Sequence, residues 1–141
     1  SWQGRLKNIS KNNEEYIIYT KNETTYKKNY KLYNQDGENV LSKDDIDDLV
    51  PYENFLTYTK DNILYIIDYD GKQLISNIKL YFSDEYNYTR VKSYSVKVVG
   101  TTLVISTPKT NDDTHYTDEY YYNTSDWSLI KSRLNVKETV S

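Results

Sequence analysis

Three groups of residues in this 141-residue chain have side chains that could support catalysis or hold a metal ion. The single histidine, His115, would need a positioned serine and an acid to act as a general base, and no nucleophile-elbow motif is present. The run Asp44-Asp45-Ile46-Asp47-Asp48 and the segment Asp68-Tyr69-Asp70-Gly71 offer the oxygen ligands that calcium prefers, but neither has the spacing of a calcium loop. We therefore expect no catalytic residue, no metal and no cofactor. We interpret His115 as a solvated loop residue, and the two acidic segments as a helix start and a hairpin turn.

Aromatic residues near the C-terminus are the best candidate for a binding surface. Tyr120, Tyr121 and Tyr122 are consecutive, and the alternation of a strand would put Tyr120 and Tyr122 on one face and Tyr121 on the other. Trp127 follows after a short turn and could pack beside them. Exposed tyrosine and tryptophan are favoured at protein interfaces and as platforms for sugars, whereas in a core they form cross-strand pairs. The sequence predicts a surface at Tyr120, Tyr122 and Trp127 for a protein or glycan, with core packing as the alternative.

The composition favours strands. The chain has 17 Tyr and 31 Val, Ile and Leu residues, and it lacks Ala, Met and Cys. Aromatic and β-branched residues suit a pleated sheet, and the best helix former is missing. Abundant Lys, Asn, Ile and Tyr are also typical of an AT-rich genome, so a low-GC bacterial origin would explain the tyrosine content equally well.

The charge and the missing cysteines exclude several classes of protein. A net charge of −3 with interspersed signs leaves no basic stripe for a nucleic acid. Without cysteine there is no disulfide framework, thiolate metal site or cysteine nucleophile. No apolar run approaches the roughly 20 residues that span a bilayer.

Apolar runs and turn residues alternate along the chain and predict hairpins. Residues 54–60 and 63–68 flank Asp61-Asn62 and predict a tight hairpin, and Gly71 supplies the positive φ of a following turn. Three units share one order: an apolar strand, a Tyr-rich strand, an Asp-containing turn and a short strand. They open at Tyr16, Phe55 and Leu103.

Two family resemblances bear on the architecture. The segment from Asp61 to Leu74 resembles the inner strands of a β-propeller blade of secreted bacterial proteins, and unit openings about 40 to 48 residues apart are typical of blades. The opening Trp2-Gln3-Gly4 is similar to the Trp–Gly pairing in the first strand of lipocalin-like barrels, except that in those barrels the glycine precedes the tryptophan. Propellers usually need at least four blades, whereas a barrel closes one sheet on itself and removes its edges.

We therefore expect one all-β domain over residues 1–141, an antiparallel meander of about 8–11 strands that forms a barrel, half-barrel or sandwich. Three propeller-type blades are the alternative. One connecting helix is predicted over residues 42–50, because Ser42 suits an N-cap, acids follow in the first turn, and Pro51 lies just beyond its end.

For function, the sequence favours a non-enzymatic binding or interaction module that uses a Tyr-rich sheet face or loop end. A small barrel carrying an apolar ligand and an immunity or inhibitor protein are the alternatives. We expect an extracytoplasmic location, with a leader or anchor removed upstream, because the chain begins at Ser1 without a methionine.

Overall fold

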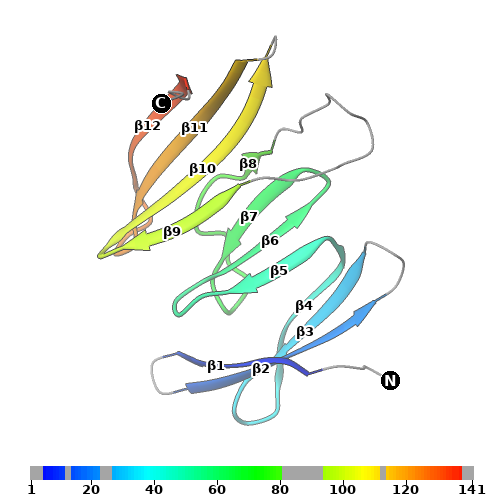
Figure 1. Cartoon of the computed structure of the whole chain (residues 1–141). Helices are drawn as coiled ribbons and strands as arrows, with labels where there is room; N and C mark the ends of the chain where they lie inside the picture. Colours follow the sequence, from blue (N-terminus) through cyan, green and yellow to red (C-terminus); the bar gives the residue numbers. More distant parts are fainter. Residues whose placement is uncertain (1–4, 12–13, 23–26, 81–93, 112–113, 138–141) are drawn as a thin grey trace. The chain divides into compact units, whose positions relative to one another are not determined.

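Three antiparallel sheets make up the part of the chain that a computed structural model describes, which is residues 5–11, 14–22, 27–80, 94–111 and 114–137 (Figure 1). Sheet A contains β1 (Arg5–Lys11), β2 (Glu14–Asn22), β3 (Lys28–Tyr33) and β4 (Asn39–Ile46). Sheet B contains β5 (Asp48–Pro51), β6 (Leu56–Lys60), β7 (Ile63–Ile67) and β8 (Ile78–Lys79). Sheet C contains β9 (Ser95–Val99), β10 (Thr102–Asn111), β11 (Thr114–Asn123) and β12 (Leu129–Lys137).

Each sheet is a four-stranded meander, because its strands lie side by side in chain order. The predicted all-β antiparallel class is confirmed. The described residues form no closed barrel. The segment Trp2-Gln3-Gly4, on which the resemblance to lipocalin-like barrels rests, lies outside the described residues.

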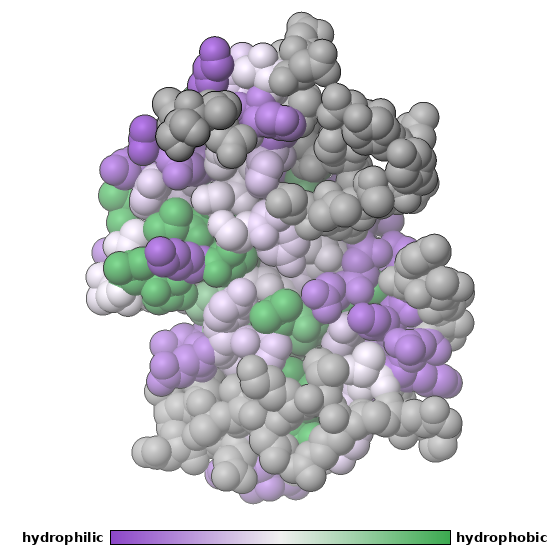
Figure 2. All heavy atoms as spheres, viewed as in Figure 1, coloured by the Kyte–Doolittle hydropathy of each residue, from purple (hydrophilic) through white to green (hydrophobic). Residues whose placement is uncertain are grey.

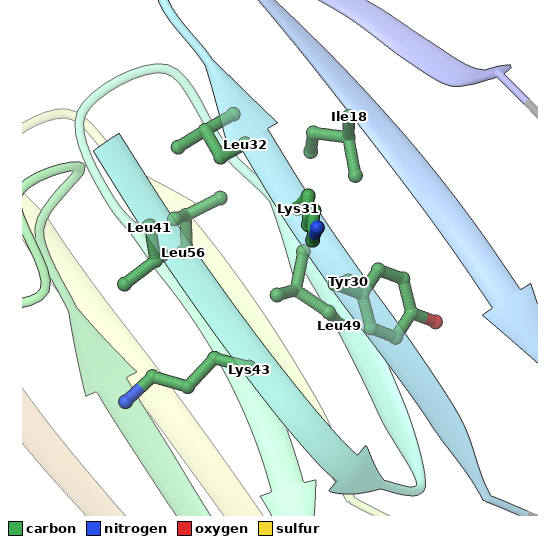
Figure 3. A pocket seen from close by; sticks show the side chains of 8 residues that line it. All are labelled: Ile18, Tyr30, Lys31, Leu32, Leu41, Lys43, Leu49 and Leu56. Atoms are coloured by element: carbon green, nitrogen blue, oxygen red, sulfur yellow. The ribbon is translucent and has the colours of Figure 1, made fainter. Parts of the chain in front are cut away.

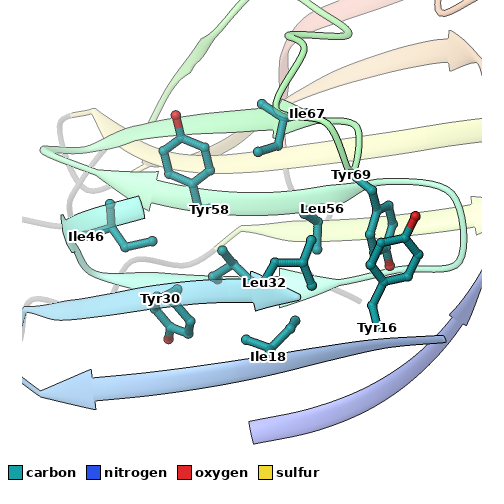
Figure 4. Packing of buried hydrophobic residues seen from close by; sticks show 10 residues of the cluster. Tyr16, Ile18, Tyr30, Leu32, Ile46, Leu56, Tyr58, Ile67 and Tyr69 are labelled. Carbon is teal, nitrogen blue, oxygen red and sulfur yellow. The ribbon is translucent and has the colours of Figure 1, made fainter. Parts of the chain in front are cut away.

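The chain divides into two compact units, Ser1–Ile78 and Lys79–Ser141. In the first unit, the core contains side chains from β2, β3 and β4 of sheet A and from β5, β6 and β7 of sheet B (Figure 4). Among them Ile18, Leu32 and Leu56 are at most 3% exposed. Two sheets that bury apolar side chains between them form a sandwich, so the sandwich alternative fits this unit.

Tyrosines supply a large part of that core. Tyr16, Tyr30, Tyr58 and Tyr69 are all buried in it. The rings of Tyr16 and Tyr69 lie next to each other (Figure 4), with their centres 4.8 Å apart, and Tyr58 stacks on its cross-strand partner Tyr65 with a distance of 4.6 Å between the ring centres. Burial raises the pKa of Tyr30 to about 12, with a smaller contribution from the negative charge of Asp48. In this unit, therefore, many tyrosines serve packing.

The hairpin predicted around Asp61-Asn62 is confirmed. Lys60 pairs with Ile63, so Asp61 and Asn62 form a two-residue loop between β6 and β7. Both have positive φ, 51° and 68°, which is the conformation of a type I′ turn. This turn matches the right-handed twist of the strands that it joins, and Asn and Asp tolerate it better than most residues.

Sheets A and B share a second kind of turn, after their third strands. In sheet A, Oδ1 of Asn34 accepts hydrogen bonds from the backbone N–H groups of Asp36 and Glu38, both at 3.0 Å. In sheet B, Oδ1 of Asp68 accepts from the N–H groups two and four residues on, at 2.9 and 2.8 Å. A glycine with positive φ stands at the fourth position of each turn, Gly37 at 81° and Gly71 at 88°. The predicted turn at Gly71 is thus confirmed.

Sheet C has a related turn that is one residue longer. Oδ1 of Asn123 accepts a hydrogen bond from the N–H of Ser125 at 2.8 Å, and Asp126 accepts from the N–H and hydroxyl of Ser128. Trp127 occupies the positive-φ position, at 61°. Related turns thus follow the third strand of all three sheets.

The helix predicted over residues 42–50 is wrong. The segment instead runs through the end of β4 into β5. Asp45 has a φ of 58°, which no right-handed helix can contain, and its N–H donates to Oδ1 of Asn29. Ile46 and Leu49 have helical spacing, but each enters the core from a different strand. Pairing with β3 and β6 therefore outweighs the local helix signals.

Candidate interaction surface

The register of β10 and β11 decides which aromatic rings share a face of sheet C. Leu103 pairs with Tyr122 and Ile105 with Tyr120, so these four residues lie on one face. Tyr121 pairs with Val104 and lies on the other face. The predicted division of the three consecutive tyrosines between the two faces therefore agrees with the register.

The three predicted site residues differ in exposure. Tyr122 is buried at 6% exposure, and burial raises its pKa. Tyr120 and Trp127 are half-buried, Tyr120 in β11 and Trp127 in the turn before β12. Trp127 therefore lies close in sequence to the exposed start of β12, whereas Tyr122 belongs to the packed face.

Large exposed apolar side chains gather on the two edge strands of sheet C. Within the described ranges, those at least 43% exposed are Val98, Val99, Leu129, Ile130 and Leu134. All five lie on β9 or β12, and we call them the sheet C rim. Figure 2 shows a hydrophobic area of the surface where, in Figure 1, β9 ends and β12 begins.

One apolar row crosses the whole width of sheet C. The pairing places Val98, Leu103, Tyr122 and Leu129 opposite one another on four successive strands. The middle two residues are 0% and 6% exposed, and the outer two are 43% and 54% exposed. The row is thus buried at its centre and open to solvent at both edges.

Strand β12 carries two bulges. Ile130 is the extra residue between the pairs Tyr122–Leu129 and Tyr121–Lys131. At the second bulge, Leu134 and Asn135 stand opposite Asp118 alone. The two bulges bring the rim residues Ile130 and Leu134 to either side of the regular stretch 131–133.

Asp118 holds the second bulge in place. Its side chain is buried and accepts a hydrogen bond from the N–H of Asn135 at 2.8 Å, where the backbone has a φ of 57°. Lys109 forms an ion pair with the same carboxylate at 3.0 Å. A buried charge needs such partners, so this end of β12 is firmly specified.

The exposed side chains of β12 are cationic as well as apolar. Lys131, Arg133 and Lys137 lie on it, and the strand contains no acid. The Nζ of Lys131 lies 4.7 Å from the ring centre of Tyr121, and the Nη1 of Arg133 lies 3.4 Å from the Oε1 of Glu119. The edge strand thus combines exposed leucine and isoleucine with positive charge, in a chain whose net charge is −3.

The other residues that could support catalysis or bind a metal ion do not form a site within the described structure. His115 is exposed and lies in β11, opposite Thr110, so its predicted place in a loop is wrong. The sequence around it extends the β10–β11 hairpin, because the neighbouring Thr114, Tyr116 and Thr117 are of types that suit strands. Across the described ranges, no three His, Cys, Asp or Glu side chains are grouped to hold a metal ion. Those ranges also include no helix with the length and apolarity needed to cross a membrane.

A small cavity lies in the core of the first unit, and Figure 3 shows the residues that line it. Its volume is about 10 Å³, and its lining includes Ile18, Leu41 and Leu56. That is the space of about one water molecule, far below the roughly 300 Å³ at which ligand pockets begin. Lys43 borders it with its amino group turned away, toward the ring of Tyr58 at 5.1 Å.

Comparison of the chain with protein-family models, curated proteins and solved structures gives no match.

Proposed function

We propose that the chain is a protein-binding module whose contact surface is the sheet C rim, with Trp127 beside it. A single observation carries this proposal: within the described residues, the large apolar side chains that are well exposed all belong to the edge strands of one sheet. Isolated exposed apolar residues are normal on any protein, but a group of them marks an interaction site.

The backbone of the rim supports the same function. Among the strands that the structure describes, β9 and β12 are the edges of sheet C, so each has a row of backbone N–H and C=O groups that no described strand pairs with. Proteins often recognise extended partners by adding a strand to such an edge, with side-chain contacts providing specificity. Each of the two edges of sheet C offers both kinds of contact.

Trp127 adds an aromatic group to the surface. Its φ of 61° is unfavourable for a bulky residue, and glycine occupies the equivalent position in the other two turns. Residues kept in strained conformations cluster at functional sites, and tryptophan is enriched among the residues that dominate binding energy. Core packing accounts for Tyr122 instead, which is buried.

Site-specific photo-cross-linking tests the proposal. A benzophenone amino acid is placed at Leu134 and, as a matched control, at the exposed Lys72 of the other unit, and cells that produce the protein are irradiated. We expect a discrete adduct from position 134 and none from position 72.

The cross-linked partner is then purified and titrated with the wild-type chain and with the double variant Leu129→Ser, Leu134→Ser. Loss of the exposed apolar contacts should weaken binding about tenfold or more, since 1.4 kcal/mol corresponds to a factor of ten. Equal affinity for both proteins, or adducts only from position 72, would contradict the proposal.

A further inference from the structure

The charges of β12 indicate which chemistry its partner has. The exposed edge strand carries three cations, Lys131, Arg133 and Lys137. Among the described residues, Glu119 forms an ion pair with Arg133. Leu129, Ile130 and Leu134 lie between and beside these cations, each more than half exposed. A complementary strand would therefore present carboxylates alternating with apolar side chains.

A second copy of this chain does not match that pattern. Two β12 strands paired edge to edge would bring the lysines and arginines of both copies together, and like charges opposite each other destabilise a sheet. Lysine on an edge strand is a known protection against such self-association. The bulges at Ile130 and at Leu134-Asn135 also twist the edge away from a straight copy of itself.

We infer that β12 binds an extended acidic segment of a partner protein, which adds to sheet C as a fifth strand. This inference rests on the proposed function and specifies the partner's chemistry. The backbone groups of residues 131–133, the regular stretch between the two bulges, provide the strand pairing. The cations select carboxylates, and the bulged apolar residues contact the alternate side chains of the segment.

A peptide titration followed by amide NMR tests the inference on the whole chain. The probe is a blocked nonapeptide of the sequence TEVEVEVET, and the two controls are TKVKVKVKT and a nonamer of glutamate. We expect TEVEVEVET to shift the β12 amides and to bind about tenfold more tightly than either control, with weaker binding as the screening length falls to about 8 Å at 0.15 M salt.

A charge reversal provides the second arm. The variant Lys131→Glu, Lys137→Glu leaves Arg133 and its ion pair with Glu119 intact. Its amide spectrum reports whether sheet C is retained. We expect this variant to lose TEVEVEVET binding and to gain affinity for TKVKVKVKT.

Four results would overturn the inference. Equal binding of the glutamate nonamer would mean unspecific attraction of polyanions. Equal binding of the lysine peptide would remove the role of the cations. Concentration-dependent changes of the β12 amides without peptide would identify a second copy as the occupant. If cross-linking at Leu134 captures a partner while TEVEVEVET does not bind, the proposed function stands and only this inference falls.

Discussion

Replacing Asp68 by alanine should destabilise the first unit through the loss of one turn. The Asp68 carboxylate accepts two backbone hydrogen bonds, from the N–H groups of Asp70 and Lys72 at 2.9 and 2.8 Å. A hydrogen bond contributes about 0.5–1.5 kcal/mol net, so the loss of both should cost about 1–3 kcal/mol. In a unit of this size 1 kcal/mol corresponds to about 4–8 °C in Tm, so we expect a decrease of about 4–24 °C.

The chain itself provides the matched control. Asn34 occupies the equivalent position of sheet A and makes the same pair of bonds through its amide oxygen. Asp68→Asn should therefore stay within about 0.5 kcal/mol of wild type, because it keeps the acceptor and removes only the charge. Differential scanning calorimetry of the three proteins gives the comparison. Equal loss of stability in Asp68→Asn and Asp68→Ala would refute the reasoning, since charge and not the accepted hydrogen bonds would then matter.

Three further predictions concern single residues. Gly71→Ala should lower the free energy of unfolding, measured in urea, more than Gly37→Ala does. Both substitutions place an L residue at positive φ, which costs about 1–2 kcal/mol each. Only at Gly71 would the new Cβ also meet Leu41 Cδ1, at 3.0 Å. Similar values for the two variants would contradict this. The pKa of Tyr30 is raised from 10.0 to about 12, so its neutral form is favoured in the folded state. This difference contributes up to about 2.7 kcal/mol to the free energy of unfolding below pH 10, and the contribution is lost as the pH rises through 12. Tyr30→Phe should accordingly move alkaline unfolding, followed by tyrosinate absorbance and circular dichroism, to higher pH, and an unchanged midpoint would count against the assignment. Trp127→Gly should relieve strain of about 1 kcal/mol in the turn and yet weaken partner binding, so a variant that unfolds more readily and binds equally well would show that the ring serves packing alone.

Local signals in the sequence were sufficient where the chain folds on its nearest neighbours. Asp61-Asn62 between two apolar runs predicted the type I′ hairpin, and the turn at Gly71 followed from the same kind of signal. The alternation of side chains also assigned Tyr120 and Tyr122 to one face, in agreement with the register. Each sheet is a four-stranded meander, and propeller blades are also four-stranded sheets. The resemblance to propeller proteins stays a prediction.

The errors arose where distant contacts decide. Ser42, the acids after it and Pro51 have the pattern of a capped helix, but pairing with β3 and β6 holds the segment extended. The sheet C rim was missed for a related reason. Leu129 and Ile130 look like core residues in a sequence, and their exposure depends on their position at an edge, which no local pattern contains.

Hydrogen exchange of the chain alone and in complex with the cross-linked partner is the most direct test of the rim as the binding surface. Edge amides open readily, and a partner that pairs with them slows their exchange. The account predicts slower exchange in β12, over Leu129–Lys137, or in β9, over Ser95–Val99, with no change in β6 and β7. Slowing confined to the first unit, with the amides of both edge strands unaffected, would contradict it.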